Sequence, residues 1–382
     1  MKTTFTAAQA AAFRLGRHHL GPTTTNDQQP TTKDQRPTSI EALCRDTGGI
    51  QAQVMSQAEI ALWTRARDLT RSDIQSALYE RREIVKTAAL RLTLHLISAR
   101  DFPAYVTALK PAFTVYMQRQ FARLGAKPAQ VDAMMTTVMD ALQDGPRTQQ
   151  ELIALARRRA GPKMRLWLKY AWSAVRPLVI EGLICYGPPR GGQVTFVRVD
   201  QWLPKRPAID IAEARVTLVR RFLGAFGPAS ASDFSRWCAM RVTAARPLFD
   251  SMRDELVQVS VDGASGWMLR RDRAELADST LDVRSPRLLP AFDSFILAHA
   301  TKEHLIDRKH YKRVWRSQGW ISPVVLLGGA IVGVWFPKTS GKTCTLEVDL
   351  FDRQPRSIRD GIEREAEALS AFVGTPTGVV FL

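Results

Sequence analysis

Three segments of the sequence carry the same helix-start pattern, and this repetition constrains the fold more than any other feature. Thr70, Thr148 and Ser230 are each followed three residues later by an acid and then by an apolar residue. The hydroxyl can accept a hydrogen bond from the backbone amide of the acidic residue, whose charge favours the first turn of a helix. The three starts are 78 and 82 residues apart. The spacing therefore predicts a unit that occurs three times.

Each of these helix starts is followed by a second helical stretch and then by strand-like sequence. The strand-like runs are Ile84–Ile97, Leu183–Val199 and Leu256–Arg270. The second run contains a Gly-Pro-Pro-Arg-Gly-Gly turn, and the third contains the turn Asp262-Gly263. Helix, helix and β-hairpin is the order of a winged helix, so we predict an α+β protein of tandem winged-helix repeats. The alternative is an α+β enzyme whose similar helix starts are a coincidence.

The ends of the chain differ from the repeats. A helix is predicted from Thr6 to Leu20, a polar loop at 23–37, and helix again from Ser39. From Leu288 onward, strand-like runs separated by Gly-rich turns precede a helix, Ser357–Phe372, which predicts a small β-rich domain. The predicted organisation is an N-terminal winged-helix region at 1–140, a second winged helix at 141–205, a third at 206–286 and a C-terminal β-rich domain at 287–382.

The charge balance indicates a polyanionic partner. The chain has 54 Lys and Arg against 37 Asp and Glu, a net charge of +17. DNA, RNA or an anionic membrane surface would complement it, while the alternative is a basic protein that is merely well solvated. The longest apolar stretch, Pro323–Phe336, is too short to span a bilayer, so we expect no membrane. Four scattered cysteines and the lack of a signal peptide favour a cytoplasmic protein.

Common catalytic and cofactor motifs are missing from the sequence. Gly341-Lys342-Thr343 resembles the end of a phosphate-binding loop, but position 336 is Phe instead of Gly. The six histidines have no metal-ligand spacing, and no cluster of acids has one either. We therefore expect no metal and no cofactor, which disfavours a metal-dependent nuclease.

Gln51 and Gln53 form a pair of amides after two glycines, in the segment Gly48-Gly-Ile-Gln-Ala-Gln53. In an extended or kinked backbone both amides would point to one side, whereas in a regular helix they would diverge by roughly 200°. Paired amides can hold one water molecule or hydrogen-bond a base edge. The alternative interpretation is the polar start of a helix.

The run Leu90–Leu96 alternates between leucine and polar residues and predicts a strand. Its polar row, Arg91, Thr93 and His95, is suited to contact with phosphate or sugar. The alternative is a half-exposed strand whose polar face is only solvated.

Two further candidate segments lie near the C-terminal domain. Asp293, a candidate DNA- or lesion-binding residue, is a single acid among aromatic residues, and its burial would require a partner or would perturb its pKa. The stretch 302–316 is basic with interleaved aromatics, which is typical of a surface that binds a nucleic-acid backbone. The alternative is a solvated charged loop. The candidate DNA contacts in this stretch are Arg308, Lys309, His310, Lys312 and Arg313.

Four motifs in one order resemble the AlkZ-like DNA glycosylases, with which the YcaQ proteins are grouped. They are Gly49-Ile-Gln-Ala-Gln53, Arg91-Leu-Thr-Leu-His95, Cys185-Tyr-Gly-Pro-Pro189 and Leu288-Leu-Pro-Ala-Phe-Asp293. The resemblance covers the chain from Phe13 to its C-terminus, apart from the 23–37 stretch. The family's AlkZ branch has Gln-x-Gln where the YcaQ branch has Gln-x-Asp, so this chain looks like the AlkZ branch. The family usually has Gly where this chain has Leu92.

The resemblance implies a monofunctional glycosylase that removes bulky N7- or N3-alkylated purines, including interstrand cross-links, from double-stranded DNA. It implies that Gln51 and Gln53 position a water molecule and contact the deoxyribose. It also implies a C-shaped assembly of tandem winged helices, and we expect a monomer. The alternative function is a non-catalytic winged-helix protein that binds DNA and releases no base.

Overall fold

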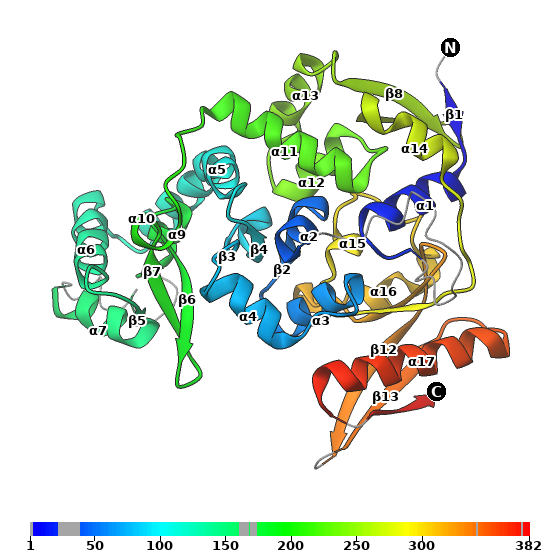
Figure 1. Cartoon of the computed structure of the whole chain (residues 1–382). Helices are drawn as coiled ribbons and strands as arrows, with labels where there is room; N and C mark the ends of the chain where they lie inside the picture. Colours follow the sequence, from blue (N-terminus) through cyan, green and yellow to red (C-terminus); the bar gives the residue numbers. More distant parts are fainter. Residues whose placement is uncertain (1–2, 22–38, 160–167, 169–173, 341–342, 376) are drawn as a thin grey trace. The chain divides into compact units, whose positions relative to one another are not determined.

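The structure is a computed structural model, which describes residues 3–21, 39–159, 168, 174–340, 343–375 and 377–382 (Figure 1). The loop predicted at 23–37 lies outside these described residues. Both helices and strands are present, so the predicted α+β class is confirmed, while the tandem winged-helix arrangement stays a prediction. The chain divides into two compact units. The first comprises Met1–Ile74, Val219–Trp237 and Arg241–Leu382, and the second comprises Gln75–Leu218 and Cys238–Met240.

All three predicted helix starts form capping boxes. The Asp73 amide donates to the Thr70 hydroxyl at 3.2 Å, and the Thr70 amide donates to the Asp73 carboxylate at 2.8 Å. The same two bonds join the residue pairs of the other starts, Thr148 with Glu151 and Ser230 with Asp233. The helices that begin here are α4 (Arg71–Tyr79), α7 (Gln149–Arg159) and α12 (Ala231–Cys238).

The second unit contains two β-hairpins with helices beside them. β3 (Ile84–Ala88) pairs antiparallel with β4 (Leu94–Ser98), and β6 (Ile184–Arg190) pairs antiparallel with β7 (Gln193–Arg198). β5 (Arg147–Thr148) lies on the other side of β7. Leu94, Leu152 and Phe196 belong to one buried apolar cluster of this unit. Its other helices are α5 (Phe102–Arg123), α6 (Pro128–Ala141), α9 (Arg176–Ile180) and α10 (Val199–Trp202).

The first repeat departs from the predicted order. α4 is followed directly by β3, so the expected second helix is wrong for this repeat. The strand expected over Leu90–Leu96 is also wrong in its first half, because a short 3₁₀ turn occupies Leu90–Leu92 and β4 begins only at Leu94. Arg91 and Leu92 have φ values of 54° and 58°, and this left-handed backbone reverses the chain between the two strands.

The second hairpin has a tighter turn than the sequence indicated. β6 continues through its two prolines to Arg190, and the turn is Gly191-Gly192, with φ values of 57° and 75°. The register shifts between Gly187 and Arg190, which accommodates prolines that cannot donate to the strand ladder.

The third repeat has the predicted order of helix, helix and hairpin. α13 (Val242–Ser251) follows α12, and β8 (Leu256–Val261) pairs antiparallel with β9 (Ala264–Leu269). Asp262 and Gly263 form the predicted turn, with φ values of 45° and 86°. α11 (Ile211–Phe226) precedes α12 and α14 (Arg273–Asp278) follows β9.

The N-terminal residues pack on this third hairpin. β1 (Thr4–Phe5) pairs in parallel with β8, although it is more than two hundred and fifty residues away in the chain. α1 (Ala7–Arg17) begins at the Thr6 cap, which confirms the predicted first helix. The Arg17 guanidinium forms ion pairs with Asp272 at 2.7 Å and Glu275 at 2.6 Å.

The C-terminal part is a five-stranded sheet with one long helix. Its strand order is β10-β11-β12-β13-β14, antiparallel except for the last pair. The apolar residues of α17, Ile358, Ile362, Ala366 and Leu369, recur at helical spacing and belong to the same buried cluster as Trp335. The predicted strands and helix of this region are confirmed. Their bounds are β10 (Arg287–Leu289), β11 (Val324–Leu327), β12 (Ala330–Ser340), β13 (Thr343–Leu350), α17 (Arg356–Val373) and β14 (Thr377–Phe381).

Candidate active site

The segment with the two glutamines begins at a turn that requires glycine. α2 (Ile40–Asp46) is capped by the Ser39 hydroxyl, and after it the Gly49 amide donates to the Cys44 carbonyl at 2.8 Å. Gly48 and Gly49 have φ values of 67° and 105°. A Cβ at Gly48 would lie 2.9 Å from the indole of Trp237. Position 48 thus needs glycine both for its backbone conformation and for close packing.

Gln51 and Gln53 lie in extended chain before a helix. Gln51 is the last residue of the short strand β2 (Ile50–Gln51), and Gln53 lies in a bend two residues before α3 (Met55–Arg65). Ile50 and Ala52 are 1% and 0% exposed, whereas Gln51 is half-buried and Gln53 is exposed. Because side chains alternate in extended backbone, both amides lie on the side away from the core. Both glutamines precede the first residue of α3, so the interpretation as a polar helix start is wrong, and the backbone is of the extended or kinked kind that was the other possibility.

The Asp293 carboxylate is bound by a buried arginine from the helix that follows the glutamines. The Arg65 guanidinium donates to both carboxylate oxygens at 2.8 Å, and both side chains are 0% exposed. The same Arg65 Nη1 also donates to the Ala61 carbonyl of its own helix. Asp293 accepts a third bond, at 2.9 Å, from the Phe295 amide, and so caps α15 (Ser294–Leu297). The partner that the sequence required for a buried Asp293 is thus Arg65.

The neighbours of Asp293 hold the glutamine segment from both sides. The Ser294 hydroxyl donates to the Gly49 carbonyl at 2.8 Å, two residues before Gln51. The Ala291 amide donates to the Gln57 side-chain carbonyl at 2.9 Å, in the first turn of α3. Residues 291–294 therefore span the chain on which Gln51 and Gln53 stand, and they fix its backbone.

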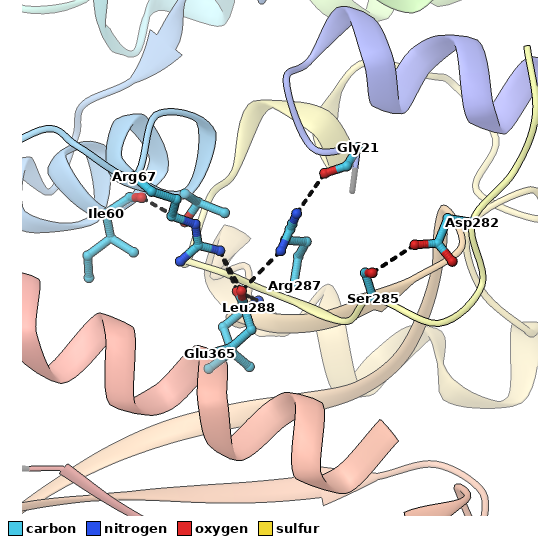
Figure 2. Close-up of polar contacts among 9 residues, drawn as sticks. Gly21, Ile60, Arg67, Asp282, Ser285, Arg287, Leu288 and Glu365 are labelled. Atoms are coloured by element: carbon cyan, nitrogen blue, oxygen red, sulfur yellow. Dashed lines mark hydrogen bonds and ion pairs between the residues drawn. The ribbon is translucent and has the colours of Figure 1, made fainter. Parts of the chain in front are cut away.

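A second ion network joins the ends of the glutamine-bearing and Asp293-bearing segments to the C-terminal helix. Figure 2 shows Glu365 of α17 between two arginines, one after α3 and one at the start of β10. Arg67 donates to both Glu365 oxygens, at 2.7 and 2.6 Å, and Arg287 donates to one at 3.1 Å. Arg287 also donates to the Gly21 carbonyl at 2.6 Å. The helix after the glutamines and the strand before Asp293 are thus joined to the C-terminal helix.

The basic stretch 302–316 is folded. It contains a 3₁₀ turn (Arg308–His310) and α16 (Tyr311–Val314), so it is more than the solvated loop that was the alternative. Arg308, Lys309 and Lys312 are exposed.

His310 and Arg313 are engaged within the protein. The His310 ring stacks on Phe351 with centroids 4.3 Å apart. Arg313 forms an ion pair with Asp349 and lies over the same Phe351 ring. The exposed Lys309 ammonium lies 3.4 Å from the Asp307 carboxylate, and Arg308 and Lys312 carry the other two exposed cations among the five candidate DNA contacts.

The polar row Arg91, Thr93 and His95 is not a solvated strand face. Arg91 lies in the turn before β4, and the Thr93 hydroxyl donates to the Leu90 carbonyl at 3.0 Å. His95 is 1% exposed, and its Nδ1 lies 3.0 Å from the Thr93 carbonyl oxygen. Burial, assisted by the nearby charge of Arg91, lowers the pKa of His95 to about 3, so the imidazole is neutral at pH 7.

Leu92 stands where the resemblance implies a glycine, in a backbone conformation that favours glycine. Its φ of 58° lies in the left-handed region, which glycine adopts freely and leucine only with strain. The usual glycine of the family would fit this conformation, and this chain instead places a half-buried leucine there.

The candidate residues are distributed over both units. Gln51, Gln53, Asp293 and the basic stretch belong to the first unit, and Arg91 to His95 belong to the second. The sequence reasoning missed Arg65, Gln57 and Ser294. The buried acid signalled that a cation was needed, but nothing local pointed to Arg65, which is 228 residues away.

An amide pair on a clamped backbone, in a strongly basic α+β chain, fits the class of enzymes that act on DNA. Comparison with known proteins identifies the class. The family model described as DNA glycosylase AlkZ-like matches residues 44–372. A curated relative from Streptomyces sahachiroi, named Interstrand DNA cross-link repair glycosylase, is 33% identical over 344 residues, which are 86% of each chain.

A solved structure agrees with the family model. Streptomyces sahachiroi DNA glycosylase AlkZ matches with a TM-score of 0.82 and 29% identity, over 100% of both chains. The chain therefore belongs to the AlkZ-like family and is a DNA glycosylase, as the four sequence motifs indicated. Within the described ranges, no helix has the length and apolar character needed to cross a membrane.

Proposed function

We propose that this glycosylase hydrolyses the N-glycosidic bond of purines alkylated at N7 of guanine or N3 of adenine, and that its natural substrates carry bulky or cross-linking adducts. The named activity of the Streptomyces sahachiroi relative, interstrand DNA cross-link repair, supports this class of lesion. The net charge of +17 supports a double-stranded DNA substrate, on which the protein acts as a monomer.

The chemistry requires positioning more than acid catalysis. Alkylation at N7 or N3 gives the base a positive charge, so the base leaves with the bonding electron pair and needs no proton from the enzyme. The deoxyribose C1′ becomes electron-poor, and a water oxygen attacks it and releases its proton to solvent. The products are a free alkylated base and an abasic site. A group that holds the water in line with C1′ accelerates this reaction.

Gln51 and Gln53 are suited to that task. Each amide offers one carbonyl acceptor and two N–H donors, and together they can orient a water molecule and contact the deoxyribose. The observation that carries the proposal is their exposure: Gln51, at the end of β2, is half-buried and Gln53, in the bend before α3, is exposed, while Ile50 and Ala52 beside them are buried. Because the backbone of this segment is held by hydrogen bonds, the glutamines lose less conformational entropy when the substrate binds.

The other candidate residues have supporting roles in this proposal. Exposed Arg308, Lys309 and Lys312 bind the DNA backbone, and His310 and Arg313, which pack on Phe351, belong to the same DNA-binding stretch. Arg91 and Thr93, which are half-buried, contact sugar or phosphate, whereas the buried His95 acts through the backbone of Thr93. Asp293 acts through the backbone of residues 291–294, because its carboxylate is bound by Arg65.

The experiment uses duplex DNA that carries one N7-alkylguanine, in a methyl and a bulky version. Each is incubated with wild type and with the Gln51→Ala, Gln53→Ala double variant in EDTA, and alkali then breaks the strand at abasic sites. We expect strand breaks with wild type and none with the double variant. Gln118→Ala, which replaces an exposed glutamine on α5, is the matched control and should produce abasic sites as wild type does. Full activity of the double variant would remove the glutamines from the mechanism.

A further inference from the structure

An aromatic pair lies on the segment that holds the glutamine backbone. Phe292 stands between Ala291 and Asp293, and its ring meets the indole of Trp320 edge to face, with centroids 5.0 Å apart and planes at 78°. Phe292 is half-buried and packs on the apolar core of the first unit. Trp320 is 45% exposed. Indoles are usually well buried in proteins, so an indole that packs on Phe292 and still leaves 45% of its surface exposed is unusual.

The backbone fixes the position of both rings. Phe292 has a φ of 61°, which bulky residues rarely adopt and which persists only where the surroundings enforce it. The neighbouring bonds from Ala291 to Gln57 and from Ser294 to Gly49 provide that enforcement. Trp320 ends a tight loop closed by a hydrogen bond of 2.9 Å from the Arg316 amide to the Trp320 carbonyl. The two rings therefore form a preformed surface.

Positive charge and further aromatic surface surround Trp320 in the chain. Arg316 and Lys312 are exposed, and Trp315 is bridged by backbone pairing to Ile321, next to Trp320. Tyr311 is 39% exposed and stacks on Trp315 with centroids 4.7 Å apart. Cations that hold the phosphate backbone beside exposed aromatic faces are the combination with which proteins bind unstacked bases.

We propose that Phe292 and Trp320 hold the planar, apolar part of a bulky adduct on the alkylated purine, and that Trp320 makes the enzyme selective for adduct size. This inference rests on the proposed function. Residues 291–294 are bonded on both sides of Gln51 and Gln53, so an adduct on the reacting base would project beside them. A methyl group is too small to cover the indole, whereas an aromatic adduct would bury it against Phe292.

Equilibrium binding tests the proposal without requiring turnover. Three matched duplexes carry guanine, N7-methylguanine or N7-benzylguanine, each with a 2′-fluoro group on the lesion sugar to block hydrolysis. We expect Trp320→Ala to lose about tenfold in affinity for the benzyl duplex and less than twofold for the other two. Trp320→Phe should retain most of the benzyl preference. Tyr116→Ala, an aromatic residue 44% exposed on α5, is the matched control and should bind all three like wild type.

Two results would overturn the proposal. An equal loss on all three duplexes would show that the indole contacts ordinary DNA, and unchanged binding of the benzyl duplex would show that it makes no contact. Equal melting temperatures of wild type and Trp320→Ala would show that the variant is folded, and if it is not, Trp320→Leu, which also lacks an aromatic ring, gives the same comparison. A Trp320-dependent benzyl preference without base release from the non-fluorinated duplexes would uphold this inference and reject the proposed function. Release of both adducts by wild type, with binding unaffected by Trp320 substitution, would uphold the proposed function and reject this inference.

Discussion

Arg65 and Asp293 form a two-bond ion pair in which neither side chain is exposed, and the pair joins the helix after the glutamines to the segment that holds them. Neither charge is hydrated by solvent, so each is compensated only by its partner, and removing one partner leaves an uncompensated buried charge. The Asp293 carboxylate also caps α15 through the Phe295 amide.

Removing one partner of this pair is expected to be costly. Asp293→Ala leaves a buried guanidinium without its carboxylate and should lower the free energy of unfolding by about 3–5 kcal/mol. Denaturant unfolding measures the change. Asp250→Ala is the control, because Asp250 pairs with Arg253 at the surface, where the side chains are 57% and 68% exposed, and such pairs contribute about 0–1 kcal/mol. A loss below about 1 kcal/mol for Asp293→Ala would show that the Arg65–Asp293 pair does not hold these two segments together.

Stability should fall as the solution becomes acidic, because buried histidines are held neutral. Burial lowers the pKa of His18 and His299 well below the ordinary value, and it lowers that of His95 to about 3. In the unfolded chain each histidine takes up a proton near pH 6.5, while the folded chain does not. The stabilisation is therefore complete above pH 6.5 and is lost as the pH falls from there toward the folded pKa.

Below pH 6, the free energy of unfolding is expected to fall by about 1.4 kcal/mol per pH unit for each such histidine. His18 lies between the rings of Phe226 and Phe295, with centroids 4.7 and 5.2 Å away, so phenylalanine is a suitable replacement. His18→Phe should remove one histidine's share of the slope, as measured by denaturant unfolding between pH 5 and 7. An unchanged slope in the variant would show that His18 does not titrate in this way.

The affinity for DNA should depend on salt through the basic stretch. Each phosphate contact contributes about 0.9 to the slope of log affinity against log salt for duplex DNA. Replacing Arg308, Lys309 and Lys312 by alanine should lower that slope by about 2–3 and weaken binding to all sequences alike. Lys338→Ala is the control, since Lys338 is 71% exposed but pairs with Glu347 at 2.9 Å. A slope that does not change in the triple variant would place the DNA elsewhere.

The sequence predicts the structure well where the determining contacts are local. The three capping boxes involve residues only three positions apart, and all three form. The Asp262-Gly263 turn and the apolar spacing of α17 are likewise encoded over a few residues.

Prediction fails where distant residues or strain decide. The strand through Arg91 and Leu92 was expected because the pattern alternates, yet both residues adopt a left-handed backbone that the pattern does not encode. The pairing of β1 with β8 and the bond from Arg65 to Asp293 each join residues more than two hundred positions apart. The sequence thus located the glutamine pair but not the residues that hold it.

We propose that Gln51 and Gln53 perform the chemistry while other residues provide most of the affinity for DNA. Single-turnover excision of N7-methylguanine, measured beside the dissociation constant of the same duplex, separates the two. We expect the Gln51→Ala, Gln53→Ala variant to lose at least about a hundredfold in the excision rate, while its affinity for DNA stays within about threefold of wild type. An excision rate close to wild type, or a loss that appears entirely as weaker binding, would contradict it.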